Sequence, residues 1–150
     1  GTQGQFLLTM HRLDQPCTGV LFLGKTTKAA SRIQSKWQDL HKIYHCVIYR
    51  DNLSNLMQAS VPTSRDGNNV AMMEYEISGM LLPHKNPRQK TVRMVAESSI
   101  DGREKIKEQS KLCRLKWKVL KQSKKGPFVM IQVETNLGRR HMIRALLGQV

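Results

Sequence analysis

The chain has 150 residues and a formal net charge of +14, because 25 Lys and Arg stand against 11 Asp and Glu. This length suits one domain with a substantial core, and the 39% hydrophobic content is typical of a globular fold. No apolar run approaches the length of a membrane span and no secretory signal is visible, so we expect no membrane partner. The excess of cations indicates a polyanionic partner, with nucleic acid the first candidate.

The first half of the sequence predicts a strand, a helix and a second strand. "GVLFLG" (19–24) is an apolar run between glycines, which is typical of a buried strand. Residues 26–42 have the pattern of an amphipathic helix capped by Thr26 or Thr27. Its apolar face comprises Ala30, Ile33, Trp37 and Leu40. "KIYHCVIYR" (42–50) is rich in β-branched and aromatic residues, which favours a strand.

The middle of the chain predicts loops between further strands. Residues 51–70 have a loop-like composition and include the turn sequence "SRDGNN". Residues 72–80 and 91–96 are strand-like, and the basic, proline-containing residues 81–90 between them favour a loop. Residues 98–110 are polar and predict a turn or a short helix.

The last third predicts a β-hairpin followed by a helix. Residues 111–122 alternate regularly, with an apolar side of Cys113, Leu115, Trp117 and Val119 and a cationic side of Arg114, Lys116 and Lys118. "SKKG" predicts the turn and residues 127–135 the returning strand. Residues 136–148 predict a helix that Asn136 would cap. Many antiparallel strands with few helices give an α+β fold, which we expect to form a single domain over 1–150.

The cysteines and histidines do not form a recognisable metal or disulfide pattern. Cys17, Cys46 and Cys113 are far apart and odd in number, which favours buried thiols in a reducing compartment. His41 and His45 have no partner at metal-ligand spacing. "GKTTK" lacks the upstream glycine of a phosphate-binding loop, and no nucleophile elbow is present. We therefore expect no metal site.

Asp14, in "HRLDQPCTGVLFLGKT", is the acidic residue with the most unusual surroundings. It lies two residues after Arg12 and just before the apolar run, where a carboxylate needs a cationic or amide partner to stay ionised. One interpretation is a structural ion pair or turn cap, and the other is a catalytic acid.

Tyr44 and the arginines near the end of the chain are the other candidates. Tyr44 lies on a predicted strand of a basic protein, where it either fills the core or stacks on a base. Arg140 and Arg144 are i,i+4 neighbours next to Arg139, an arrangement that suits a solvated basic helix or an anion site.

Several of these segments together resemble the RluA-type pseudouridine synthases. "HRLDQPCTG" is similar to the H-R-L-D-x-x-T/S-S/T-G motif, "HKIYHCVI" to the K-x-Y motif, and "GRRHMIR" to G-R-x-H-Q-I/L-R. "KLCRLKWKVL" resembles the family's alternating strand, and the order and spacing agree over nearly the whole chain. The chain departs from the family at Met142, where Gln is usual, and at Cys17. The segments that normally flank the outer motifs are absent, so we expect the domain to be incomplete at both ends.

The resemblance implies roles for individual residues. Asp14 matches the nucleophile that attacks the target uridine, Tyr44 the aromatic that stacks on the flipped base, and Arg144 the partner of the carboxylate. Arg12 matches the arginine that fills the space of the flipped nucleotide. The residues expected to bind RNA are Arg12, Arg139, Arg140, His141, Lys116 and Lys118.

Two hypotheses of different class follow. The first is an RNA pseudouridine synthase without a cofactor, acting on ribosomal RNA by preference, with transfer and messenger RNA as alternatives. The second, motivated by Met142 and the high basicity, is a catalytically silent RNA-binding ribosome-assembly factor that retains the fold. A DNA-binding protein is a third and weaker interpretation. We expect the mitochondrial matrix as the compartment, with the cytoplasm or nucleus as alternatives.

Overall fold

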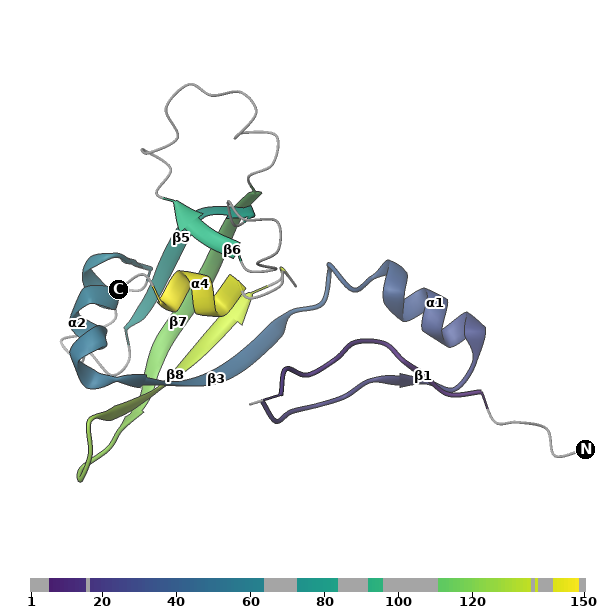
Figure 1. The fold of residues 1–150 in the computed structure, drawn as a ribbon, viewed down its shortest axis with the longest axis horizontal. Coiled ribbons are helices and arrows are strands. Elements are labelled where there is room, and N and C mark those ends of the chain that lie inside the picture. The colour runs from purple at the N-terminus through teal and green to yellow at the C-terminus, as the bar shows by residue number, and fades with distance from the viewer. Residues whose placement is uncertain are drawn as a thin grey trace, which may run out of the picture. The chain divides into compact units, whose positions relative to one another are not determined.

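The computed structural model describes residues 6–15, 17–63, 73–83, 92–95, 111–135, 137 and 142–148 (Figure 1). The chain divides into two compact units, Gly1–Leu40 and His41–Val150, each of which is described by itself. The mainly antiparallel strands and few helices confirm the predicted α+β class. Within the described ranges, no helix is long and apolar enough to cross a membrane.

The first unit consists of a short β-ribbon and one helix. Strands β1 (Leu8–Thr9) and β2 (Leu23–Gly24) pair in antiparallel fashion. Helix α1 (Thr27–Ser35) begins after Thr26, whose side-chain oxygen accepts a hydrogen bond of 3.1 Å from the backbone N–H of Ala29. The predicted cap is therefore confirmed at Thr26, although the helix ends earlier than expected.

The prediction of a buried strand over 19–24 is wrong. Only Leu23 and Gly24 form a strand, and Val20 to Leu23 are all exposed. A two-stranded ribbon with a single nine-residue helix has little surface with which to cover an apolar run on both sides. Of this run, Gly24 alone is buried.

The second unit is built on a six-stranded antiparallel sheet. The strand order is β3-β8-β7-β5-β4. The remaining strand, β6, pairs with the last residues of β5. The elements in chain order are β3 (Lys42–Tyr49), α2 (Arg50–Gln58), β4 (Val61–Pro62), β5 (Glu74–Pro83), β6 (Val92–Val95), β7 (Lys111–Gln122), β8 (Phe128–Thr135) and α4 (Met142–Leu147). The strands predicted at 42–50, 72–80, 91–96, 111–122 and 127–135 are confirmed in type, with small differences at their ends.

Helix α2 corrects the prediction of a loop over 51–70. Leu53, Leu56 and Met57 are spaced so that they lie on one side of the helix, and Leu56 is fully buried. The polar residues around them gave the segment a loop-like composition. The turn sequence "SRDGNN" and residues 84–91, 96–110 and Asn136 lie outside the described residues.

The core lies on one face of the sheet, between the strands and the two helices. The inward side chains of β7 and β8 meet Leu56 of α2 and Met142 and Leu146 of α4. The predicted apolar side of β7, comprising Cys113, Leu115, Trp117 and Val119, is buried as expected. Among the cysteines the expectation of burial holds only in part, because Cys113 is buried, Cys46 half-buried and Cys17 exposed.

Candidate active site

Asp14 lies on a turn between the two strands of the first unit. Its backbone carbonyl accepts a hydrogen bond of 2.9 Å from the N–H of Cys17, which closes the turn. The Asp14 side chain is half-buried, whereas Arg12, two residues earlier, is exposed. The predicted nucleophile is thus presented by a closed turn on a segment that is anchored at both ends by β1 and β2.

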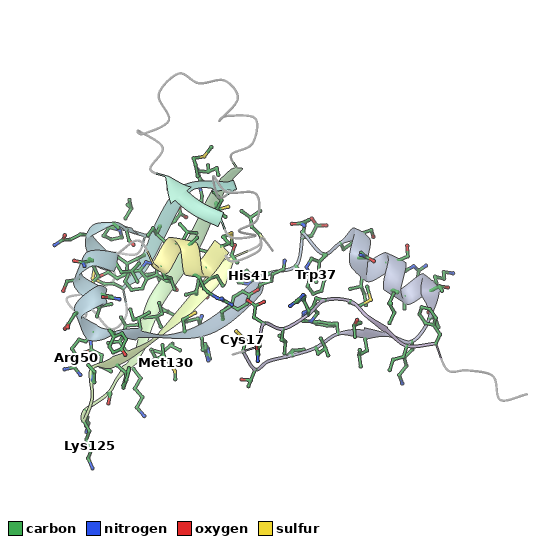
Figure 2. The ribbon with its side chains drawn as sticks, viewed as in Figure 1. Cys17, Trp37, His41, Arg50, Lys125 and Met130 are labelled. Carbon is green, nitrogen blue, oxygen red and sulfur yellow. The ribbon has the colours of Figure 1, made fainter. Side chains whose placement is uncertain are left out.

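An aromatic cluster holds the start of this segment, and the sequence patterns did not indicate it. The ring of His11 stacks on Trp37, which is labelled in Figure 2, with centroids 4.9 Å apart, and Phe22 meets the same Trp37 edge-on at 6.2 Å. His11 Nε2 also accepts a 3.2 Å hydrogen bond from the backbone N–H of Phe22. His11 and Trp37 therefore position the residues that lead to Asp14. The signals in the sequence were a histidine three residues before an acid and the place of Trp37 on the predicted apolar face of residues 26–42.

Tyr44 lies on β3, which forms one edge of the sheet of the second unit. It is paired with Val133 of β8, so its side chain is on the same face as the buried core. Because an edge strand is covered on fewer sides, Tyr44 keeps 41% of its surface exposed. An exposed ring at this position is able to stack on a planar group, but the stacking of Tyr44 on a base stays a prediction.

Arg144 lies on α4, a helix that packs over the same face of the sheet. Met142 and Leu146 are buried beneath the helix, while Arg144 is exposed. The structure therefore brings Tyr44 and Arg144 to one face of the second unit. Arg139, Arg140 and His141 lie outside the described residues.

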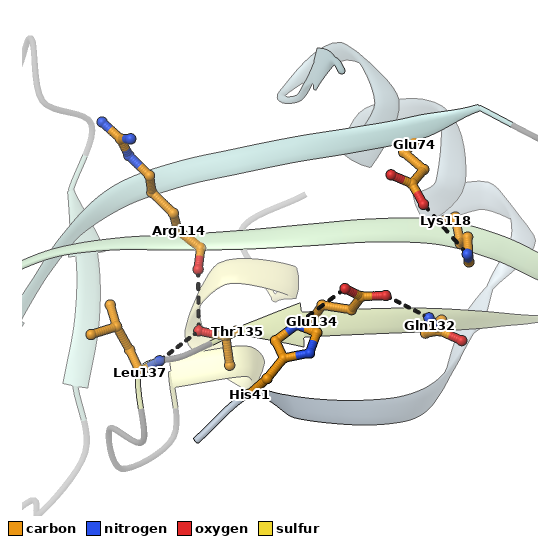
Figure 3. A network of polar contacts seen from close by, with 8 residues as sticks. All are labelled: His41, Glu74, Arg114, Lys118, Gln132, Glu134, Thr135 and Leu137. Carbon is orange, nitrogen blue, oxygen red and sulfur yellow. Dashed lines mark hydrogen bonds and ion pairs between the residues drawn. The ribbon is translucent and has the colours of Figure 1, made fainter. Parts of the chain in front are cut away.

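Thr135 is the last residue of β8 and its side chain makes hydrogen bonds with two backbone groups; the sequence patterns did not single it out. Its buried hydroxyl donates to the carbonyl of Arg114 at 3.3 Å and accepts from the N–H of Leu137 at 3.0 Å (Figure 3). Next to it, Glu134 accepts a 2.6 Å hydrogen bond from Gln132 and lies 3.2 Å from His41 Nε2. A threonine at the end of a strand, just before the G-R-R-H sequence, was the signal for this role.

Lys116 and Lys118 lie on the other face of the sheet. The strand register places Lys116 between Glu76 of β5 and Glu134 of β8. It places Lys118 opposite Glu74, whose carboxylate lies 3.4 Å from the lysine Nζ. The outer side of β7 is cationic as predicted, but carboxylates on the neighbouring strands partly neutralise its positive charge.

The described residues offer no ready site for a metal. Within the part of the chain that the structure describes, no group of three or more His, Cys, Asp or Glu side chains is arranged to hold an ion. The chemistry available to the predicted site residues is that of a carboxylate, an aromatic ring and a guanidinium.

The sequence matches the family model described as RNA pseudouridylate synthase over residues 2–149. Among curated proteins, tRNA pseudouridine synthase C of Salmonella typhi is 38% identical over 47 residues, or 30% of this chain and 18% of the relative. The mitochondrial pseudouridylate synthase RPUSD4 of Xenopus tropicalis is 28% identical over 104 residues, or 67% of this chain and 29% of the relative.

Two solved human structures have a similar fold. The chain aligns with RNA Pseudouridylate Synthase Domain Containing 4 at a TM-score of 0.62 and 15% identity, over 95% of this chain and 47% of that one. RNA Pseudouridylate Synthase Domain Containing 1 aligns at a TM-score of 0.60 and 16% identity, over 96% and 51%. The chain thus spans about half of these structures and less than a third of the curated relatives.

Proposed function

Since the chain belongs to the RNA pseudouridylate synthase family, we propose that it isomerises uridine to pseudouridine in structured RNA, with Asp14 as the nucleophile. The observation that carries this proposal is the presence, in one chain and in family order, of the motifs around Asp14, Tyr44 and Arg144. In this reaction the bond from the sugar to N1 of uracil breaks and a bond from the sugar to C5 forms. A proton leaves C5 and N1 gains one, so the composition is unchanged.

The roles that we propose follow from the demands of this reaction. A base within RNA must leave its stack before its glycosidic bond can be reached. Tyr44 would stack on the extruded uracil, and Arg12 would occupy the space that it leaves. Arg144 would pair with Asp14, because a cationic partner favours the ionised form of a carboxylate in a dry pocket.

We propose that the remaining cations hold the RNA backbone. Arg139, Arg140 and His141 adjoin Arg144 in sequence, and Lys116 and Lys118 add charge on the outer face of β7. Ribosomal RNA is our preferred substrate, with transfer RNA, named for the Salmonella relative, as the alternative. The name of the Xenopus relative supports a mitochondrial location, which fractionation of cells that express the tagged protein would test.

The first prediction concerns Asp14 itself. Replacing Asp14 by Asn keeps the shape of the side chain but removes the nucleophilic oxygen charge, so pseudouridine formation should fall below detection. The matched control is Asp39→Asn, an exposed acid of the same unit, which should retain wild-type activity. The measurement is mapping of pseudouridine in cellular RNA with each variant. Equal pseudouridine from Asp14→Asn and the wild type would show that another group attacks.

The alternative function is that of a catalytically silent RNA-binding factor for ribosome assembly. It is favoured by Met142, which replaces the usual Gln and is buried in the core instead of offering an amide. In that case the wild type would make no pseudouridine and Asp14→Asn would leave ribosome assembly intact. Charge reversals within 111–125 would abolish assembly.

A further inference from the structure

The outer face of the sheet carries an exposed aromatic and aliphatic patch at the end farthest from Thr135. Tyr49 of β3 is paired with Phe128 of β8, and their ring centroids lie 5.4 Å apart. The next outward pair is Val47 and Met130. Tyr49 is 58% exposed and Phe128 45%, although large side chains of this kind are usually buried.

Lysines lie along one side of this patch, at the end of β7 and in the turn that follows it, while the exposed Asp51 of α2 follows Tyr49 by two residues. The segment from Val119 to Ile131 contains Lys121, Lys124 and Lys125 but no Asp or Glu. Lys121 is paired with Met130 in the sheet, so its side chain borders the patch on the outer face. All three lysines are exposed. The other end of the same face differs, because there the strand register sets lysines opposite glutamates.

The turn that presents Lys124 and Lys125 is built by specific hydrogen bonds. The Arg50 guanidinium donates to the carbonyls of Ser123 at 2.6 Å and Gly126 at 3.1 Å. The Ser123 hydroxyl accepts from the N–H groups of Lys125 and Gly126. Figure 2 shows Lys125 at the tip of this hairpin, with Arg50 and Met130 nearer the sheet. The backbone of the turn that carries both lysines is thus fixed, and Gly126 of this turn lies close to the Phe128 ring.

We propose that Tyr49 and Phe128, together with Lys121, Lys124 and Lys125, bind a single-stranded stretch of RNA. Exposed aromatic rings next to cations are the elements with which proteins stack bases and follow a phosphate backbone. Within the second unit, the surface is separate from Tyr44 of the proposed catalytic site. Tyr49 lies about 16 Å along β3 from Tyr44, and its side chain points to the opposite face. The proposal rests on RNA as the partner of the proposed function but requires no catalysis.

The test measures binding of a fluorescent single-stranded oligoadenylate, which offers no uridine to the proposed catalytic site. The double variant Tyr49→Leu/Phe128→Leu keeps an apolar surface but removes both rings, and its affinity should fall about tenfold or more. The matched control is Leu112→Ala, which trims an exposed apolar side chain of the same face near its other end and should bind as the wild type does. Unchanged affinity of the leucine variant would overturn the proposal, and the patch would then suit an apolar protein partner.

The lysines are tested through the salt dependence of the same binding. Lys124→Ala/Lys125→Ala should reduce the slope of log affinity against log salt by about 1.4, since each contact with a single strand accounts for about 0.7. The charge-matched control, Lys28→Ala/Lys36→Ala, removes two exposed lysines from the first unit and should leave the slope unchanged. Equal changes in both variants would mean that only net charge matters, which would overturn the assignment. Pseudouridine formation, assayed separately, decides the proposed function independently of these results.

Discussion

Gly24 of β2 lies so close to helix α1 that there is no room for a side chain. A Cβ atom placed on Gly24 would lie 2.9 Å from the Cβ of Ala30 and 3.2 Å from its Cα. Both are rigid atoms of a buried helix position, so the ribbon and the helix would have to separate. We therefore expect Gly24→Ala to cost about 1–3 kcal/mol of local stability. The measurement is hydrogen exchange of the α1 amides, which should become faster.

Gly19 provides the control for this prediction within the same unit. Among the described residues, a Cβ there would meet only Leu13 Cδ2, at an ordinary contact distance of 3.7 Å. Gly19→Ala should accordingly leave the exchange of α1 unchanged. If both variants exchange alike, close approach of β2 and α1 is not what requires glycine at position 24.

At the scale of elements, a side-chain hydrogen bond joins the end of α2 to β7. The indole N–H of Trp117, a fully buried residue, donates to the hydroxyl of Ser60 at 2.9 Å. That hydroxyl in turn donates to the carbonyl of Leu56 at 2.6 Å. Ser60→Ala would leave the buried N–H without its acceptor, so we expect a loss of about 1–3 kcal/mol in the free energy of unfolding.

A double-mutant cycle in urea isolates this bond. In a Trp117→Phe background there is no N–H to satisfy, so Ser60→Ala should cost clearly less than in the wild type. Equal costs in the two backgrounds would show that Ser60 acts only through Leu56.

The elements that the sequence predicted well are those whose pattern repeats over many residues. Strand β7 alternates over twelve residues, so its two sides were assigned correctly. Helix α2 has nine residues, of which only three are apolar, and the others are polar or charged residues such as Asp, Asn and Ser, so composition favoured a loop. The run at 19–24 shows the opposite error, because apolar composition says nothing about whether a neighbouring element covers a strand.

At the scale of the whole molecule, the sequence alone predicted only part of the candidate site. Motifs selected Tyr44 and Arg144, and the structure brings both to one face of the second unit. Alternation showed that Lys116 and Lys118 share a face, but not that this is the face opposite Tyr44, nor that glutamates lie across from them. Such relations depend on strand order and register, which local patterns do not encode.

The distribution of buried residues predicts that the two units differ in their ability to fold alone. Among the described residues of Gly1–Leu40, only Gly24 and Ala30 are buried, whereas the whole core cluster lies in His41–Val150. Chains of about 40 residues seldom fold without additional support. We expect a fragment of residues 41–150 to unfold cooperatively. A fragment of residues 1–40 should show no cooperative unfolding transition.

Each fragment carries one tryptophan, which makes the measurement direct. Trp117 is 1% exposed, so the larger fragment should fluoresce at short wavelength and shift sharply to longer wavelength in urea. In the smaller fragment, the fluorescence of Trp37 should change only gradually with urea, because a helix of nine residues is only marginally stable without tertiary packing. A larger fragment with no cooperative transition would mean that the sheet needs the first unit for its stability. With the predicted result, the turn that carries Asp14 would depend on residues outside this fragment for its order.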